Sequence, residues 1–207
     1  KFRKINKVEK LKQDSRIRQI RSLINYSGKL QNKRVLIVGC GSGQDLTIID
    51  KNLSAFDLSF NAVKLAGQNF PNNKYLVADA EFSPFIDNCF DLIICSEVLE
   101  HLYNPKETLS MVYKLLNEKG IIYISLPNIS SAEAKLFGKY WKGLDLPRHI
   151  VHYDVNSINK FISDSDFKVV DLKNENFPSS FIESIGFFLY KRRMSPKIYL
   201  LLYYLWK

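Results

Sequence analysis

Short apolar runs recur along the middle of the chain, and between them apolar residues lie three and four positions apart. The runs predict buried strands, and the wider spacing predicts helices. Strands are predicted over residues 35–38, 54–56, 74–77, 90–95, 121–126, 168–172 and 181–190. Helices are predicted over residues 44–50, 61–68, 105–116 and 157–163, with Gly120 breaking the third. The alternation indicates an α/β fold: a Rossmann-like, doubly wound, mostly parallel seven-stranded sheet with helices on both faces.

Residues 1–32 follow a different pattern, in which Lys and Arg separate the apolar positions of a helix. The apolar positions are Val8, Leu11, Ile17, Ile20, Leu23 and Ile24. Their spacing predicts a basic amphipathic helical segment. Three roles stay open for it: a solvated face packed on the domain, a lid over the active site, or contact with an anionic surface.

Residues 191–207 form an apolar and aromatic tail with flanking cations. Such a tail suits peripheral contact with a membrane, and it equally suits closing the core or a contact in a homodimer. The chain has no run of the roughly 20 apolar residues that a spanning helix needs. Its first residues also lack the apolar core of a secretory signal. We therefore expect a cytoplasmic protein, monomer or homodimer, that touches at most the inner face of a membrane.

The distribution of charge and the cysteine content bear on nucleic-acid binding, on the redox compartment and on metal binding. The net charge is +9, but residues 35–180 carry thirteen basic and eighteen acidic residues, so the basic character belongs to the two ends. A mildly acidic centre makes nucleic-acid binding by the whole domain improbable. The three cysteines Cys40, Cys89 and Cys95 form no CxxC pair. This predicts a reducing compartment and no metal site.

A glycine-rich loop stands where the first strand turns into the first helix, in the sequence Val38-Gly39-Cys40-Gly41-Ser42-Gly43. Glycines at such a turn let the backbone approach a ligand closely, near the positive end of a helix dipole. Gln44 replaces the third glycine of a dinucleotide fingerprint, and no Gly-Lys-Ser/Thr follows. Both phosphate-binding interpretations weaken, which favours a ligand with a ribose and an amino-acid end.

Two acidic residues end the next two strands. Asp57 follows the second strand, where a carboxylate accepts hydrogen bonds from ribose hydroxyls. Asp79 ends the third strand, where a carboxylate accepts a hydrogen bond from an exocyclic amine. Since the carboxyl ends of parallel strands share one edge, the loop and both carboxylates are expected to line a single ligand site.

These motifs resemble the class I S-adenosylmethionine-dependent methyltransferases over roughly residues 33–172. The most specific part is Cys-Phe-Asp-Leu-Ile-Ile-Cys-Ser-Glu-Val-Leu-Glu-His-Leu at residues 89–102. The resemblance implies a cofactor-binding domain over residues 33–190, with the substrate segment at about 128–156. The cofactor would be S-adenosyl-L-methionine and the product S-adenosyl-L-homocysteine.

The resemblance also assigns cofactor contacts. The methionine end would face the glycine loop, the ribose the second strand end, the adenine the third, and the sulfonium the fourth. The residues implied are, in that order, Gly39, Cys40, Gly41 and Gly43, then Asp57 and Leu58, then Asp79 and Ala80, and finally Ser96 and Glu97. Two departures touch cofactor affinity: Ile37 replaces the usual acidic residue, and the connection from Gly43 to Asp57 is short.

Histidines are the candidate general bases for a hydroxyl acceptor. His101 either orients its loop or acts directly. His149 lies in a Pro-Arg-His segment similar to that of methyltransferases of quinone and surface-polysaccharide pathways. It is predicted to be a base or a substrate ligand, and the alternative is a helix cap. The expected acceptor is a small molecule, a sugar or a lipid-linked compound, methylated at a hydroxyl.

Two other functions stay open. Ser96-Glu97-Val98-Leu99 replaces the Asn/Asp-Pro-Pro-aromatic motif that amino-methylating DNA enzymes share, and no Pro-Cys nucleophile is present. Nucleic acid is thus an unexpected substrate, although the basic N-terminal arm would let an RNA methyltransferase hold RNA electrostatically. The other alternative is a cofactor-binding module without catalysis.

Overall fold

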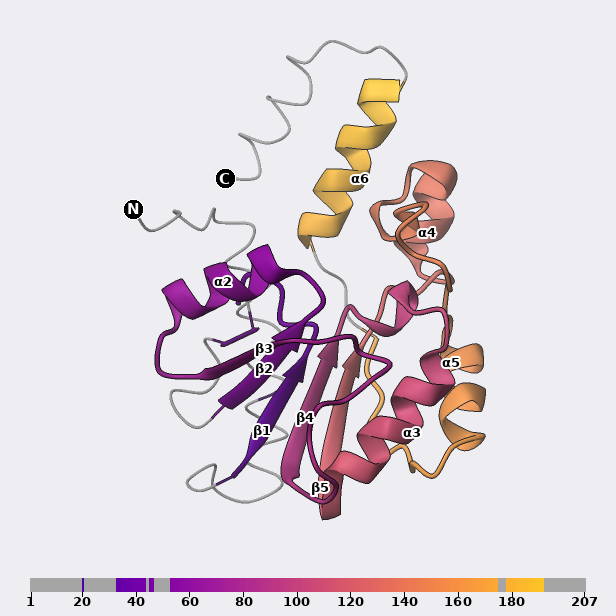
Figure 1. Cartoon of the computed structure of the whole chain (residues 1–207). Coiled ribbons are helices and arrows are strands. Elements are labelled where there is room, and N and C mark those ends of the chain that lie inside the picture. The colour runs from indigo at the N-terminus through magenta and orange to yellow at the C-terminus, as the bar shows by residue number, and fades with distance from the viewer. Residues whose placement is uncertain (1–19, 21–32, 44, 47–52, 175–177, 192–207) are drawn as a thin grey trace.

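The computed structural model describes residues 20, 33–43, 45–46, 53–174 and 178–191. Within them five strands form one sheet in the order β3-β2-β1-β4-β5 (Figure 1). The strands are β1 (Val35–Val38), β2 (Leu53–Asp57), β3 (Lys74–Val77), β4 (Phe90–Ser96) and β5 (Leu116–Ser125). All neighbouring strands run parallel. The prediction of a Rossmann-like α/β fold is confirmed.

Alternate residues of the central strands feed two separate cores. In β1, Val35 and Ile37 join the cluster on one face, and Leu36 and Val38 join the cluster on the other. All four side chains are almost fully buried. Continuous apolar runs are what strands covered on both faces require, which is why these segments contain no polar alternation.

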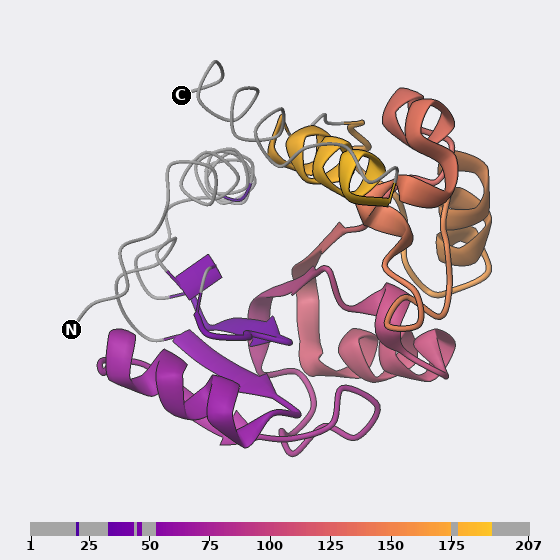
Figure 2. The same cartoon turned by 90° about the horizontal axis from the view of Figure 1, so that it is seen from above.

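Helices cover both faces of the sheet (Figure 2). The helices are α2 (Phe60–Asn69), α3 (Pro105–Leu115), α4 (Ala132–Phe137), α5 (Val155–Ser163) and α6 (Pro178–Lys191), with short 3₁₀ turns η2 (Leu99–His101), η3 (Gly138–Tyr140) and η4 (Lys142–Leu144). Ala66 of α2 packs in one core, together with Ile20, whereas Val112 of α3 packs in the other. The doubly wound arrangement and the helices predicted over 61–68, 105–116 and 157–163 are confirmed.

The prediction of seven strands is wrong for the described residues, which form five. Residues 168–172 are irregular, and Val170 exposes 69% of its surface, so this segment buries too little to act as a sheet strand. Residues 181–190 belong to α6. In that helix Ser184 and Leu189 are buried while Phe187 and Tyr190 are exposed, a one-sided burial that a short apolar run does not reveal.

The third predicted helix and the fifth strand meet earlier than expected. Helix α3 ends at Leu115, and β5 begins at Leu116 rather than Ile121. The pairing with β4 shifts register between Phe90 and Leu92, which accommodates the residues before Gly120. The basic segment 1–32, apart from Ile20, most of the predicted helix 44–50 and the tail 192–207 lie outside the described residues.

Candidate active site

The parallel strands point with their carboxyl ends toward α4 and α6, which rise beyond that edge of the sheet (Figure 1). The glycine loop stands there, directly after β1. Its glycines Gly39, Gly41 and Gly43 have φ angles of +68°, +50° and +96°, values that side chains disfavour. A Cβ on Gly39 would lie 2.6 Å from Cγ2 of Val98, whereas a Cβ on Gly41 would meet no atom within 4 Å. The loop therefore packs at Gly39 against Val98, the residue before η2, and opens outward at Gly41.

Asp57 holds the glycine loop through backbone hydrogen bonds. Its Oδ2 accepts from the N–H of Gly41 at 2.8 Å, and its Oδ1 accepts from the N–H of Ser59 at 2.8 Å. The N–H of Cys40 also donates to the carbonyl oxygen of Phe56 at 3.0 Å. Each carboxylate oxygen keeps a second lone pair, so Asp57 can still accept hydrogen bonds from ligand hydroxyls.

The other cofactor residues predicted on β2 and β3 lie around this link. Asp79 accepts the N–H of Glu81 at 3.0 Å through Oδ1, and the N–H of Ala78 donates to the carbonyl oxygen of Asp57 at 3.1 Å. Leu58 exposes 71% of its surface, and Ala80 is half-buried beside the core. The ends of β2 and β3 are thus tied together, with Leu58 available for contact.

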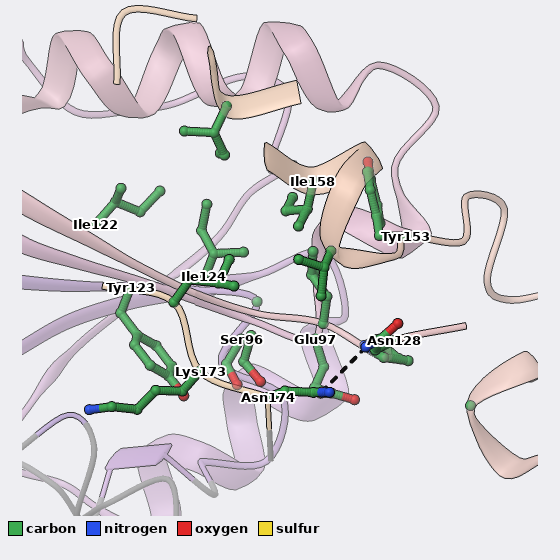
Figure 3. A pocket seen from close by; sticks show the side chains of 18 of the residues that line it. Ser96, Glu97, Ile122, Tyr123, Ile124, Asn128, Tyr153, Ile158, Lys173 and Asn174 are labelled. Atoms are coloured by element: carbon green, nitrogen blue, oxygen red, sulfur yellow. Dashed lines mark hydrogen bonds between the residues drawn. The ribbon is translucent and has the colours of Figure 1, made fainter. Parts of the chain in front are cut away.

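A cavity of about 900 Å³ occupies the carboxyl edge and extends along β5. Of the predicted site residues, it is lined by Gly39, Cys40, Gly41, Ser96, Glu97, His101 and His149. Gly43, Asp57, Leu58, Asp79 and Ala80 do not line it. Figure 3 shows Ile122 and Ile124 on one face of the sheet and Tyr123 with Ser96 on the other, so the cavity reaches around β5.

All three histidines of the chain converge on one backbone segment, residues 143–148. Nδ1 of His149 lies 2.8 Å from the carbonyl oxygen of Gly143, and Nδ1 of His101 lies 2.8 Å from that of Arg148. Nε2 of His152 lies 3.0 Å from the carbonyl oxygen of Leu144. A carbonyl oxygen only accepts, so each of these nitrogens carries a proton. In the neutral form, His149 and His101 consequently present Nε2 as the basic nitrogen.

Two carboxylates face the basic nitrogen of His149. Nε2 lies 3.8 Å from Oδ2 of Asp145 and 4.0 Å from Oε1 of Glu100. Asp145 also pairs with Arg148 and, at 3.7 Å, with Nζ of Lys142. An imidazolium formed at His149 would have opposite charge within reach, which stabilises a protonated intermediate state.

Burial is the main cause that lowers the pKa of His149 below its ordinary value of 6.5. The Gly143 carbonyl raises the pKa, the neighbouring His101 lowers it, and Asp145 and Glu97 raise it. His149 is 6% exposed, and its ring centroid lies 4.7 Å from that of His101. The imidazole is therefore neutral at neutral pH and able to take a proton.

Two other chemistries, a thiolate nucleophile and a metal centre, would use residues at this edge of the sheet. Burial, with the nearby Asp57, raises the pKa of the Cys40 thiol to about 12, so a thiolate nucleophile is not available there. Donor atoms of Glu100, His101 and His149 lie within 4.8 Å of one another. These atoms are close enough together that they could hold a metal ion, and the expectation of no metal stays a prediction.

Several residues that line the cavity were not predicted individually from the sequence. Asp145 and Arg148 lie inside the predicted substrate segment 128–156, although their pairing could not be foreseen. Glu133 of α4 and Ser180 of α6 also line the cavity. They are joined by a 2.7 Å hydrogen bond across 47 positions of sequence. No local pattern indicates such a contact, because it depends on how α4 and α6 pack.

Comparison with known proteins identifies the family. Residues 12–172, more than half of the chain, match the model of a methyltransferase domain, and the chain belongs to this family. An uncharacterised protein of Methanocaldococcus jannaschii is 36% identical over 46% of this chain and 37% of its own length. A ubiquinone biosynthesis O-methyltransferase of Glaesserella parasuis is 27% identical over 66% of this chain and 62% of its own.

One further relative and one solved structure are similar to this chain. A malonyl-[acyl-carrier protein] O-methyltransferase of Paenibacillus is 26% identical over 78% of this chain and 67% of its own length. The solved structure of an S-adenosylmethionine-dependent methyltransferase from Thermotoga maritima superimposes with a TM-score of 0.65 at 15% identity, covering 78% of this chain and 74% of its own. The chain therefore spans about two thirds or less of the length of these curated relatives.

The cofactor that this family and fold imply is S-adenosylmethionine, and the glycine loop fits it. Gly41 opens onto the cavity where a side chain would intrude, and the neighbouring Asp57 retains acceptor capacity. The described loop residues 39–43 include no Lys or Arg that would favour a phosphate. Both observations suit a ligand with ribose hydroxyls and no phosphate.

Proposed function

We propose that this protein is an S-adenosylmethionine-dependent methyltransferase acting on a hydroxyl of a small-molecule, sugar or lipid-linked acceptor. The observation that carries the proposal is the basic Nε2 of His149, which a backbone hydrogen bond orients in the same cavity as the glycine loop. The relatives named above act, by their names, on different acceptors. The acceptor is thus proposed from the site and not from a relative.

The proposed site residues fall into two groups, those that would bind the cofactor and those that would take up the proton of the acceptor. Gly39, Gly41 and Asp57 would hold the methionine and ribose parts, with Ser96 and Glu97 beneath them. When bound, S-adenosylmethionine supplies an electrophilic methyl group on a sulfonium sulfur. Adenine contacts would come from Leu58, Asp79 and Ala80, which lie at the ends of β2 and β3. The same cavity would hold the acceptor beside the 142–149 segment.

His149 would handle the proton of the acceptor. When the acceptor hydroxyl is methylated, Nε2 of His149 would take its proton. Asp145 and Glu100 then face the new positive charge at 3.8 and 4.0 Å. Holding the reacting groups in line supplies much of the rate, so orientation by Gly143 matters as much as basicity.

Calorimetric titration with S-adenosylmethionine and S-adenosylhomocysteine tests the cofactor, with Asp57→Ala as the comparison. We expect one-site binding that weakens by more than about tenfold, roughly 1.4 kcal/mol, in the variant. Absence of binding to the folded protein would refute the proposal. Binding without methyl transfer to a broad acceptor panel would favour a non-catalytic module.

The basic arm invoked for RNA lies outside the described residues, and no described contact supports that alternative.

A further inference from the structure

The turn of residues 141–145 lies between α6 and His149. Ser184 of α6 is fully buried, and its Oγ accepts the backbone N–H of Lys142 at 2.9 Å. The next residue, Gly143, accepts the ring Nδ1–H of His149 at 2.8 Å. Ser184, which is 35 positions away from His149 in sequence, is thereby connected to its imidazole through the backbone between the N–H of Lys142 and the carbonyl of Gly143.

The Ser184 hydroxyl is itself held in place. Its single proton has two acceptors within reach, Oε1 of Glu133 at 2.9 Å and the carbonyl oxygen of Ser180 at 2.8 Å. Oε1 of Glu133 also accepts the hydroxyl of Ser180 at 2.7 Å. Because these acceptors take its proton, Ser184 turns a lone pair toward Lys142.

The turn has little room to compensate for a lost contact. A Cβ on Gly143 would lie 2.6 Å from Cε2 of the Trp141 ring, and Trp141 is 6% exposed. The indole therefore presses directly on the backbone that carries the Gly143 carbonyl. The position of that carbonyl depends on two contacts of the adjoining backbone, the indole at Gly143 and Ser184 at the N–H of Lys142.

We propose that Ser184 is a positioning residue for His149: its hydroxyl fixes the backbone at the N–H of Lys142, and the carbonyl of the next residue, Gly143, keeps the proton on Nδ1 of His149 and leaves Nε2 as the basic nitrogen. Glu133 supports it by fixing the rotation of the hydroxyl. The effect on the imidazole follows from the hydrogen bonds alone. Its effect on rate rests on the proposed function.

The test compares Ser184→Ala with Ser180→Ala in the full chain. Ser184→Ala removes the acceptor of the Lys142 N–H, and Ser180→Ala removes a hydroxyl that also bonds Glu133 but does not touch the turn. The readout is the ¹⁵N NMR spectrum of the histidine rings, which separates Nδ1–H from Nε2–H forms. Neither cofactor nor acceptor is needed.

We expect Ser184→Ala to lower the Nδ1–H fraction of His149, with Ser180→Ala matching the parent chain and Ser184→Thr restoring the signal. Where methyl transfer is measurable, kcat should fall about tenfold or more in Ser184→Ala, in the direction expected for a misplaced base. An unchanged His149 spectrum in folded Ser184→Ala overturns the inference.

Two safeguards keep the test decisive. If Ser184→Ala does not fold, Ser184→Cys replaces it, because sulfur keeps the shape but accepts hydrogen bonds poorly. An unchanged spectrum in that variant overturns the inference equally. A shifted spectrum in a protein that binds no cofactor would sustain the positioning role while refuting the proposed function, so the two failures are distinguishable.

Discussion

The backbone N–H of Gly41 donates to the carboxylate of Asp57 across 2.8 Å, linking the loop after β1 to the end of β2. Under the proposed function Asp57 also accepts the ribose hydroxyls, so cofactor binding and loop conformation would be coupled through one side chain. A change at Asp57 would then alter both the acceptor offered to a ribose and the shape of the glycine loop.

The two glycines Gly39 and Gly41 should respond differently to alanine. Gly39→Ala forces a Cβ against Val98 at 2.6 Å, and we expect a loss of about 1–3 kcal/mol in the free energy of unfolding. Gly41→Ala meets no protein atom, so its Cβ projects into open space. It should weaken S-adenosylmethionine binding with a smaller stability change. Denaturant unfolding and calorimetry on both variants check this, and equal stability losses would contradict the distinction.

Replacement of the proposed base should abolish most of the methyl transfer. We expect His149→Gln to lower kcat by about 10²–10⁴, the range typical of a lost general base. His152→Gln is the matched control, because His152 donates to the neighbouring carbonyl of Leu144. Cofactor affinity should stay near that of the parent in both. A small effect on kcat in His149→Gln would assign the proton transfer elsewhere.

Acidification should destabilise the folded protein through His149. Its pKa in the folded chain lies below the ordinary value of 6.5, chiefly because of burial. As the pH falls below 6.5, the unfolded chain binds a proton at this residue before the folded chain does. Stability is thus lost as the pH falls toward the folded pKa.

Urea unfolding on both sides of pH 6.5 measures this dependence. His149→Gln should have a shallower loss of stability on acidification than the parent chain. The His152→Gln variant retains the buried His149 imidazole and should keep the loss of stability that this imidazole causes on acidification. Equal slopes in all three would show that His149 contributes nothing to the pH dependence.

The cysteines should react in a defined order. Burial raises the pKa values of Cys40 and Cys95 to about 12, so almost no thiolate forms at neutral pH. Cys89 is only partly buried. Iodoacetamide labelling followed by mass spectrometry should modify Cys89 first, and the other two only under denaturing conditions. Early modification of Cys40 would show that the glycine loop opens readily.

Sequence patterns located the sheet because its strands are covered on both faces. Val35–Val38 and Phe90–Ser96 are nearly continuous apolar runs. Glycine or acidic residues follow these short runs, which is the pattern of a buried strand that ends at a loop. The strand predicted over residues 181–190 is wrong, since these residues belong to helix α6. A short aromatic run fits a strand and a helix equally. Their packing against η3 and η4 settles the choice.

The candidate site, like the fold, is predictable from the sequence only in part. The glycine loop, Asp57, Ser96 and His149 are recognisable because they lie at strand ends or in a polar loop. The contacts that orient them are long-range: Ser184 meets Lys142 across 42 positions. Such contacts follow from the docking of α6, which local composition does not describe.

The contact between Trp141 and Gly143 has an evolutionary consequence. With the indole in place, any Cβ at position 143 collides with the ring, so these two positions cannot drift separately. We expect family members with a smaller residue at the first position to tolerate alanine or serine at the second. In members that keep tryptophan, glycine should be the only residue found there, and the pair should covary across the family.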